Sequence, residues 1–132
     1  METYDVKTFN QRMRARTEKF SIAVYMALKE IRLNDLNRII VTQLVKSSSS
    51  VAANYSSATR GRSDAEFYSK ICIVVEECDE TVHWLRYMIL TEIMLPDRGN
   101  KLKAEAEELL RILAAIKKKL KNKRKANSKV AE

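Results

Sequence analysis

Residues 63–95 read SDAEFYSKICIVVEECDETVHWLRYMILTEIML, a stretch that contains neither glycine nor proline. Ser63 followed by Glu66 is a capping-box start, and Pro96 directly after the stretch cannot extend a helix. At roughly 1.5 Å per residue the helix would be about 50 Å long, so its apolar seam must be covered by other helices. That seam alternates steps of four and three, as in helices packed lengthwise, at Phe67, Ile71, Val74, Cys78, Thr81, Leu85 and Met88.

Three other segments carry the same helical periodicity. The last of them keeps strict four-three alternation through Leu102, Leu109 and Leu120. Two glycines and one proline in 132 residues leave few places to turn, which favours a few long helices over many short strands. The expected fold class is therefore all-α, one four-helix bundle over residues 1–123. Its helices are predicted at about residues 5–31, 36–59, 63–95 and 100–123.

The net charge of +8 is concentrated at the C-terminus. Residues 117–132 hold eight basic side chains and one acid, Glu132, which gives +7 and leaves +1 for residues 1–116. The end of the chain, KANSKVAE after Arg124, is too polar to form a core. We expect residues 124–132 to be a disordered basic tail, and the folded body up to residue 116 to be nearly neutral.

Basic side chains also cluster in the first half of helix one and in the turn before residue 63. The helix-one cluster has two readings, a solvated face paired with nearby acids or a patch that contacts phosphates. The candidates for nucleic-acid binding are Arg12, Arg14, Arg16, Lys19, Arg60, Arg62, Lys117, Lys118, Lys119 and Lys121, within a basic run that continues to Lys125.

Polar residues occupy seam positions of helix two. Ser47 and Asn54 fall in phase with Leu44 and Val51, and a buried polar side chain of this kind can fix the register of neighbouring helices. The central helix also carries four closely spaced carboxylates. Glu76 and Asp79 are interpreted as solvated, whereas Glu77 and Glu80 are candidate hydrogen-bond partners of Ser47 or Asn54. The candidate buried polar residues are Gln43, Ser47, Asn54, Glu77 and Glu80.

The second half of the central helix is apolar almost all the way round. A four-helix bundle shields one side of each helix, so the other side needs a cover of its own. Subunit contact is one explanation, and wrapping by the long last helix is the other. The candidates for oligomer contact are Trp84, Tyr87, Met88, Leu90 and Met94.

Catalytic and metal-binding patterns are absent from the sequence. Two glycines cannot build a phosphate-cradling loop, and His83 with Asp79 is too small a set for a metal site. Cys72 and Cys78 have no activating base, cannot bridge within one helix, and indicate a reducing, cytoplasmic setting. The longest aliphatic run is far short of a membrane span. We expect no enzyme activity, no cofactor, no metal and no membrane partner.

Two signatures resemble a known family. QLVKSSSSVAANY at residues 43–55, followed by Ala58, is similar to the second-helix signature of the four-helix-bundle proteins encoded in intervening sequences of bacterial 23S ribosomal RNA genes. The resemblance covers about residues 9–120. The third-helix signature of that family is matched by Phe67, Lys70, Ile73, Glu77, Glu80, Thr81, Trp84, Leu85 and Arg86, with its E-T-x-x-W-L-R pattern.

The resemblance carries implications for assembly and partners. The family is similar in fold to the accessory variability determinant of diversity-generating retroelements, a pentameric barrel that binds nucleic acid through basic surface and partners a reverse transcriptase. It implies an up-down antiparallel bundle, a ring-shaped homopentamer and an association with RNA or other nucleic acid. This chain departs from the family at Ser57, where an acid is common. It also has Glu76 and Asp79 where Lys or Arg is common, which removes positive charge from the central helix.

Two functional hypotheses from different classes follow. The first is a non-enzymatic homo-oligomeric scaffold that binds structured RNA or another nucleic acid through phosphates. The second is a protein-interaction module, such as an accessory subunit of a reverse transcriptase, whose basic surface meets an acidic protein face. Salt-dependent RNA binding favours the first, and a pull-down that survives nuclease treatment favours the second.

Overall fold

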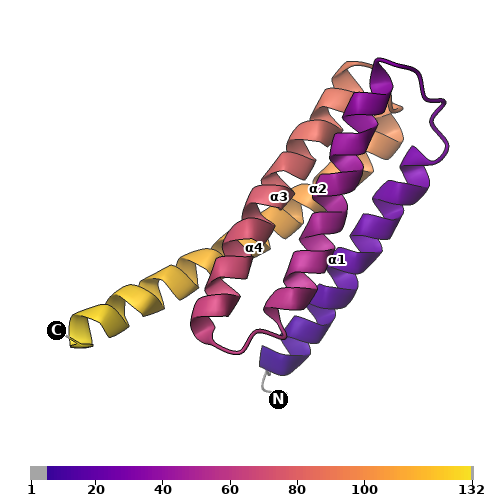
Figure 1. Ribbon diagram of the computed structural model, residues 1–132. Helices are drawn as coiled ribbons and strands as arrows, with labels where there is room; N and C mark the ends of the chain where they lie inside the picture. The colour runs from indigo at the N-terminus through magenta and orange to yellow at the C-terminus, as the bar shows by residue number, and fades with distance from the viewer. Residues whose placement is uncertain (1–5, 132) are drawn as a thin grey trace.

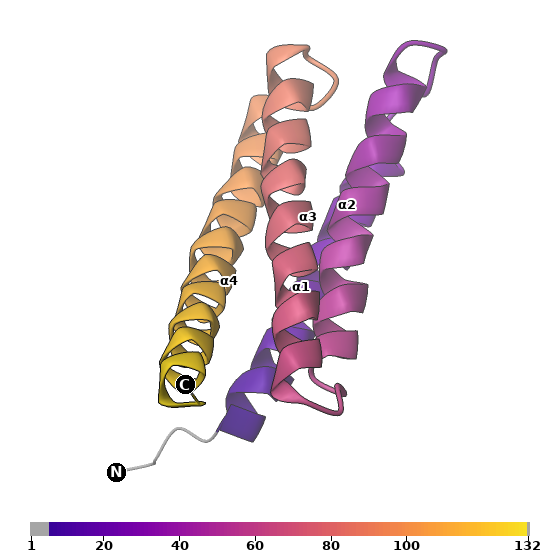
Figure 2. The same cartoon turned by 60° about the vertical axis from the view of Figure 1, so that its left-hand side comes forward.

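The computed structural model describes residues 6–131, with side chains through residue 129. Its four helices form an up-down antiparallel bundle, and the described residues contain no strand (Figures 1 and 2). Consecutive helices pack against each other, and α1 also contacts α4, which closes the bundle. The predicted all-α four-helix fold is confirmed. The helices are α1 (Val6–Leu28), α2 (Asn37–Ala58), α3 (Asp64–Leu90) and α4 (Pro96–Ala131).

The predicted seam of α3 forms the centre of the core. Each of its members is fully buried except Phe67, which is half-buried at the end of the bundle. The helix begins as the capping box predicted, because Ser63 Oγ accepts from the Glu66 amide at 3.1 Å. The other helices contribute buried side chains at Met13, Phe20, Val24, Ala27, Leu28, Val41, Leu44, Val51, Tyr55, Ala58, Ala106, Leu109 and Leu113.

The end of α3 lies at Leu90, short of the predicted residue 95. The Glu92 amide donates to the Ile89 carbonyl at 3.1 Å, and the Ile93 amide donates to the Met88 carbonyl at 2.9 Å. These two bonds form a Schellman motif, and Glu92 sits in the left-handed region at φ 61°. The apolar run continues through this turn, so hydrophobic periodicity alone extended the helix too far.

The start of α4 lies at Pro96, earlier than the predicted residue 100. Proline suits the first position of a helix, where its missing N–H would have no intrahelical partner. In the same turn, a Cβ on Gly99 would lie 2.5 Å from Ile89 Cγ1. Glycine therefore allows the beginning of α4 to approach the end of α3 closely.

The C-terminal segment corrects a sequence prediction. Residues 124–131 continue α4 as helix instead of forming a disordered tail, and only residue 132 of that segment lies outside the described residues, as do residues 1–5. Residues 117–131, called the α4 extension below, contain no glycine or proline and are rich in lysine, which has a high helix propensity. The extension projects past the bundle as the yellow end of the ribbon (Figure 1).

Candidate nucleic-acid interface

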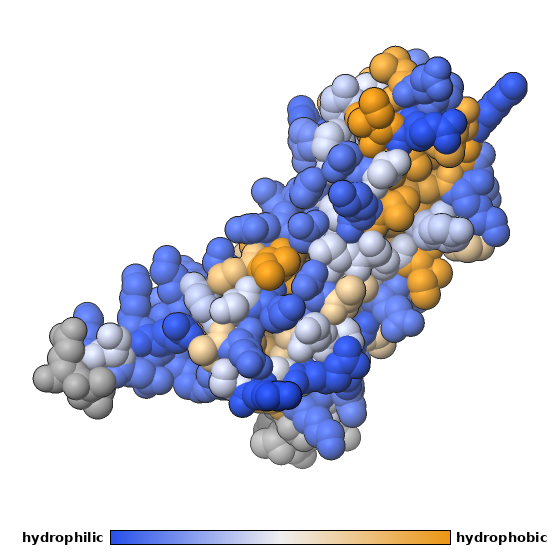
Figure 3. Space-filling model, viewed as in Figure 1, coloured by the Kyte–Doolittle hydropathy of each residue, from blue (hydrophilic) through white to orange (hydrophobic). Residues whose placement is uncertain are grey.

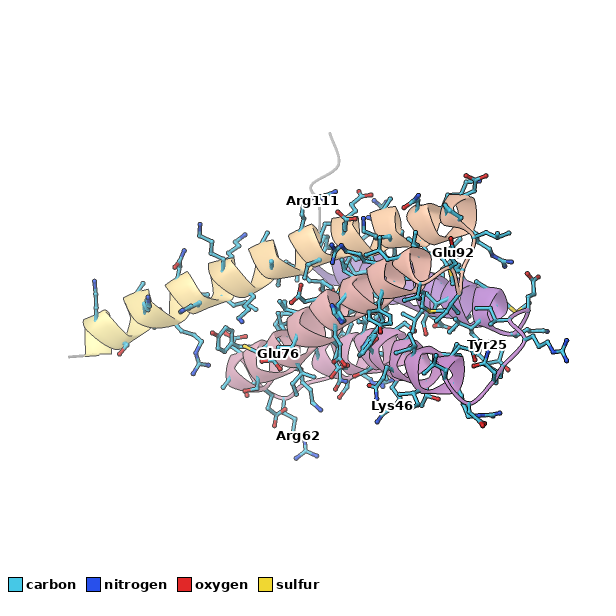
Figure 4. The ribbon with its side chains drawn as sticks, turned by 90° about the horizontal axis from the view of Figure 1, so that it is seen from above. Tyr25, Lys46, Arg62, Glu76, Glu92 and Arg111 are labelled. Carbon is cyan, nitrogen blue, oxygen red and sulfur yellow. The ribbon has the colours of Figure 1, made fainter. Side chains whose placement is uncertain are left out.

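Most of the predicted basic candidates lie at one end of the bundle. That end carries the start of α1, the turn between α2 and α3 and the departure of the α4 extension (Figure 1). Figure 4 places Arg62 toward this end, and it places Tyr25 and Glu92 toward the opposite one. The fold therefore gathers basic groups that are separated in the sequence.

Arg16 is engaged within the bundle. Its Nε and Nη2 donate to the two carboxylate oxygens of Glu105 at 3.0 and 2.7 Å, and Nη2 lies 2.9 Å from Glu108 Oε2. The hydrogen bond to Glu105 is the largest cause that raises the pKa of Arg16 above its ordinary value. Of the two readings of the helix-one cluster, Arg16 follows the first, since it ties α1 to α4.

The remaining candidates of α1 and the turn reach the surface. Arg12, Lys19, Arg60 and Arg62 are exposed, and Arg14 is half-buried near the Tyr55 hydroxyl. The Arg62 amide donates to Glu66 Oε2 at 2.7 Å, which leaves its guanidinium to point away from the turn (Figure 4).

The α4 extension carries the densest positive charge. Lys118, Lys119 and Lys121 are exposed, whereas Lys117 is half-buried beside the last packed turn. The space-filling view shows an almost continuous hydrophilic surface over this part of the chain (Figure 3). Exposed basic side chains that continue the run are Lys123, Arg124, Lys125 and Lys129.

A groove of about 610 Å³ lies between the start of α3 and the α4 extension. The Arg124 guanidinium carbon is 5.0 Å from the centroid of the Tyr68 ring, a cation–π geometry. Lys123 Nζ is 3.7 Å from Asp64 Oδ2. The groove is lined by Asp64, Tyr68, Lys121, Arg124, Lys125, Asn127 and Ser128.

Sequence reasoning missed Tyr68 as a member of this basic region. The Tyr68 ring is brought to Arg124 by the antiparallel pairing of α3 with α4, and the two residues lie far apart in the chain. The signal available in the sequence was an aromatic residue just after the predicted helix start, opposite a basic helix end. Using that signal requires knowledge of which helices pair.

The predicted buried polar set is only partly buried. Ser47 is buried, and Thr81 Oγ1 donates to Ser47 Oγ at 3.0 Å, which links α2 to α3. Gln43 and Glu77 are half-buried and Glu80 is exposed, so Ser47 has a threonine rather than a glutamate as its partner. A neutral hydroxyl pair avoids the desolvation of a carboxylate in the core.

Asn54 is a correction at one position of the predicted seam of helix two. The residue is half-buried, and its Nδ2 donates to Ser50 Oγ at 2.8 Å along its own helix. Its neighbour Tyr55 is fully buried instead, and the Tyr55 hydroxyl donates to Asn10 Oδ1 at 3.1 Å on α1. Val51 and Ala58 are buried as the seam predicted, so the seam takes a step of four from Val51 to Tyr55 where a step of three to Asn54 was expected.

The carboxylates of α3 have surface environments. Partial burial raises the pKa of Glu77, with neighbouring Glu80 as the next cause. Glu80 Oε1 accepts from Trp84 Nε1 at 3.2 Å. Neither carboxylate adjoins a nucleophile or a second titrating group across a cavity, so this pattern supports helix surface rather than a reacting centre.

The predicted oligomer contacts divide into two groups. Met88 and Met94 are buried, at 0% and 4% exposure, so they belong to the core of the single bundle rather than to an outer contact. Trp84 is half-buried and stacks edge-on with Tyr87, their centroids 5.8 Å apart. Tyr87 and Leu90 remain exposed apolar residues of α3.

The bundle end opposite the extension is strongly apolar, and we call it the apolar end. A pocket of about 760 Å³ opens there between the α1–α2 connection and the α3–α4 turn. Arg98 pairs with Glu30 at its rim. Orange surface gathers at this end in the space-filling view (Figure 3). Exposed apolar side chains on or near it are Ile22, Tyr25, Met26, Leu33, Leu36, Ile39, Tyr87, Leu90 and Leu95.

The described residues include no group of His, Cys, Asp and Glu side chains that could hold a metal ion. Cys78 is buried, and burial raises the pKa of its thiol to about 12, which keeps it protonated and unreactive. Among the helices that the structure describes, none is long and apolar enough to span a membrane.

Comparison with known proteins identifies a family and a solved structure that this chain is similar to. The sequence matches, over residues 10–115, a family model described as 23S rRNA-intervening sequence protein. The crystal structure of a protein with unknown function from the S23 ribosomal protein family of Bacteroides thetaiotaomicron is similar with a TM-score of 0.73 and 23% identity. The similarity covers 83% of this chain and 97% of that chain. No curated protein matches the sequence.

Proposed function

The chain belongs to the 23S rRNA-intervening sequence protein family, and we propose that it is a non-enzymatic, homo-oligomeric scaffold that binds RNA or other nucleic acid. The α4 extension is the binding surface in this proposal. The main observation behind this proposal is the uneven distribution of charge. The extension holds nearly all of the net positive charge, and it does so on an exposed helix.

Electrostatics supports a polyanion as the partner of the extension. Phosphate groups that replace counterions around lysine and arginine bind with a strong dependence on salt and little dependence on sequence. Arg60 and Arg62 extend the basic surface from the turn at the same end of the bundle. Free thiols at Cys72 and Cys78 suit a reducing compartment such as the bacterial cytoplasm, where structured RNA is available.

Homo-oligomerisation is supported by the apolar end. Leu36 and Leu95 expose 83% and 79% of their surface, and large contiguous apolar patches on soluble domains typically mark interaction sites. The resemblance to the accessory variability determinant favours a pentamer. A ring requires a head-to-tail contact between two different surface patches of each subunit.

Charge neutralisation tests the nucleic-acid proposal. In the full chain, Lys118, Lys119, Lys121 and Lys125 are replaced by Gln, and binding of a structured RNA is titrated across a salt series. A plot of the logarithm of the binding constant against the logarithm of the salt concentration has a negative slope. Each lost phosphate contact should make that slope shallower by about 0.7–0.9. We expect the variant to lose most of its affinity at low salt.

A matched variant controls for total charge. Lys29, Arg38, Lys46 and Lys101 are exposed on the bundle away from the extension, and their replacement by Gln removes the same charge. We expect this variant to bind RNA nearly as well as the wild type. Equal losses in the two variants would mean that only net charge matters, and no binding by the wild type would remove the nucleic-acid proposal.

The exposed apolar end also supports the second candidate, a protein-interaction module such as an accessory subunit of a reverse transcriptase. The double variant Leu36→Glu with Leu95→Glu distinguishes self-association through the apolar end from binding of another protein there. The measurement is the mass of the variant in solution. A fall to the monomer mass supports self-association through this end. An unchanged mass, with loss of a nuclease-resistant protein partner, would assign the end to that partner instead.

A further inference from the structure

The groove between α3 and the α4 extension combines an aromatic ring with several cations. Tyr68 contributes the ring from the second turn of α3, and Arg124 covers it at 5.0 Å. Lys121 and Lys125 line the same groove and lie one helical turn apart on α4. The arrangement therefore offers a planar stacking surface flanked by two positive charges.

We propose that this groove binds an unpaired nucleotide, whose base stacks on the Arg124–Tyr68 pair while Lys121 and Lys125 contact the adjoining phosphates. The inference rests on the proposed nucleic-acid binding and deepens it by naming a single-stranded segment as the preferred substrate. It assigns to Tyr68 a role in selecting the strand, and to the lysines a role in affinity.

Stacking is the reason for a single-strand preference. In a duplex the faces of the bases are already covered by their neighbours, whereas an unpaired base can stack on an aromatic ring or a guanidinium plane. Arg124 is exposed and its guanidinium carbon lies 5.0 Å from the centroid of the Tyr68 ring, so an unpaired base can reach the pair from the solvent. Lysines outside the groove contact phosphates of either form.

The size and charge of the groove suit a nucleotide. Its volume of about 610 Å³ falls in the range of roughly 300–1,000 Å³ that is usual for small-ligand sites. Three cations and one carboxylate line it, and that carboxylate, Asp64, is within 3.7 Å of Lys123. A phosphate therefore meets net positive charge.

The Tyr68 hydroxyl is compatible with a nearby phosphate. Its hydrogen bond with Cys72 is the largest cause that raises the pKa of the Tyr68 phenol. The phenol is therefore neutral at physiological pH and adds no negative charge to the groove. The stacking role belongs to the ring, so removal of the hydroxyl alone should be tolerated.

The test compares two RNA probes on full-length protein variants. One probe is a fluorescent single strand of about 12 nucleotides without self-complementarity, within the site sizes of known single-strand binders, and the other is its duplex with the complementary strand. Tyr68→Leu should weaken binding of the single strand about 10-fold or more, since one base–aromatic stack is worth about 5- to 150-fold in affinity. Duplex binding should change less than about 2-fold on the same scale.

Two further variants keep the result interpretable. Tyr68→Phe retains the ring and should bind the single strand like the wild type. His83→Leu removes an exposed aromatic ring from α3 outside the groove and should affect neither probe. Circular dichroism and thermal melting of each variant check that the fold is retained.

The outcomes distinguish this inference from the proposed function. Unchanged single-strand affinity in Tyr68→Leu, or equal losses for the strand and the duplex, would overturn the stacking site while leaving phosphate binding in place. The same holds if Tyr68→Phe is as weak as Tyr68→Leu. Failure of the wild type to bind either probe would overturn both proposals.

Discussion

The two halves of α4 are held in helical form by different forces. Between Pro96 and Ile116 the helix buries Ala106, Leu109 and Leu113 completely against the bundle. From residue 121 to residue 129 every side chain is exposed. The first half is stabilised by burial of apolar surface, and the second half relies on backbone hydrogen bonds and helix propensity.

Charge sharpens this difference. Lys117, Lys121, Lys125 and Lys129 follow one another at intervals of four, and like charges at this spacing destabilise a helix. The packed half instead carries the Lys103–Glu107 pair of opposite sign at the same spacing. A helix segment that repels itself is poorly placed to stabilise the fold, and it is well placed to attract a polyanion.

The largest expected effect comes from the packed half. Leu109→Ala leaves a cavity in a fully buried position, so the free energy of unfolding should fall by about 2–5 kcal/mol. Urea denaturation followed by circular dichroism measures this change. Lys125→Ala on the extension is the matched substitution, and we expect it to change the free energy of unfolding by less than about 0.5 kcal/mol. Similar losses in the two variants would show that the extension packs on the bundle.

Alkaline pH gives the next largest effect and acts on the bundle core. Burial raises the pKa of Tyr55 to about 12 from 10.0, so the folded state keeps its proton where the unfolded state has lost it. The contribution of the protonated Tyr55 phenol to the free energy of unfolding is fully present below pH 10 and is lost as the pH rises toward 12. The difference amounts to about 2–3 kcal/mol at roughly 1.4 kcal/mol per pKa unit.

Tyr55→Phe isolates this contribution. The variant lacks the titrating group, so its free energy of unfolding should fall less between pH 10 and pH 12 than that of the wild type. Cys78 titrates in an overlapping range and remains in both proteins. Urea denaturation of both proteins at several pH values measures the difference. Parallel curves for the two proteins would mean that the Tyr55 phenol is not held protonated by the core.

The core of α3 could be predicted from the sequence because a helical period reports burial directly. Ile71, Val74, Cys78, Leu85 and Met88 were all expected in the seam, and all are fully buried. The same reasoning failed at one position of α2, where Tyr55 rather than Asn54 is buried, since steps of three and of four both fit a period of 3.6 residues. It also failed at the α3–α4 turn, where apolar side chains continue through a Schellman motif.

The candidate interface could be predicted only in composition. The basic character of the C-terminal segment is visible in the sequence, but its helical form was not expected. The engagement of Arg16 by Glu105 and the contact of Tyr68 with Arg124 both depend on the pairing of α4 with its neighbours. Such contacts join residues distant in the chain, so periodicity within one helix carries no information about them.

The turn at the apolar end provides a smaller stability effect. Glu92 occupies the left-handed region at φ 61°, a conformation that costs a non-glycine residue about 1–2 kcal/mol. Glu92→Gly should raise the free energy of unfolding by about 0.5–1 kcal/mol, because greater freedom of glycine in the unfolded chain offsets part of the gain. Glu92→Ala keeps a Cβ and should give no such gain. A stabilised Glu92→Ala variant would assign the effect to removal of the carboxylate.

The smallest expected effect concerns the helicity of the extension itself. Charges four residues apart are separated by about 6 Å along the helix axis, and raising the salt from about 0.1 M to 1 M shortens the Debye length from about 10 Å to 3 Å. Screening should therefore relieve a few tenths of a kcal/mol per like-charge pair and increase the helical signal at 222 nm.

The salt response can be assigned to the extension by removing its repulsion. Replacing Lys121 and Lys125 by Gln removes two charges that take part in three such pairs, so the variant should gain less helicity with salt than the wild type. Lys29→Gln with Arg38→Gln on the bundle should respond like the wild type. If the two variants gain the same helicity with salt, like-charge repulsion does not reduce the helicity of the extension. The helix of the extension is then as stable as the packed half of α4. If the extension variant alone loses the response, phosphates that neutralise these lysines should order the same segment, since they relieve the same repulsion.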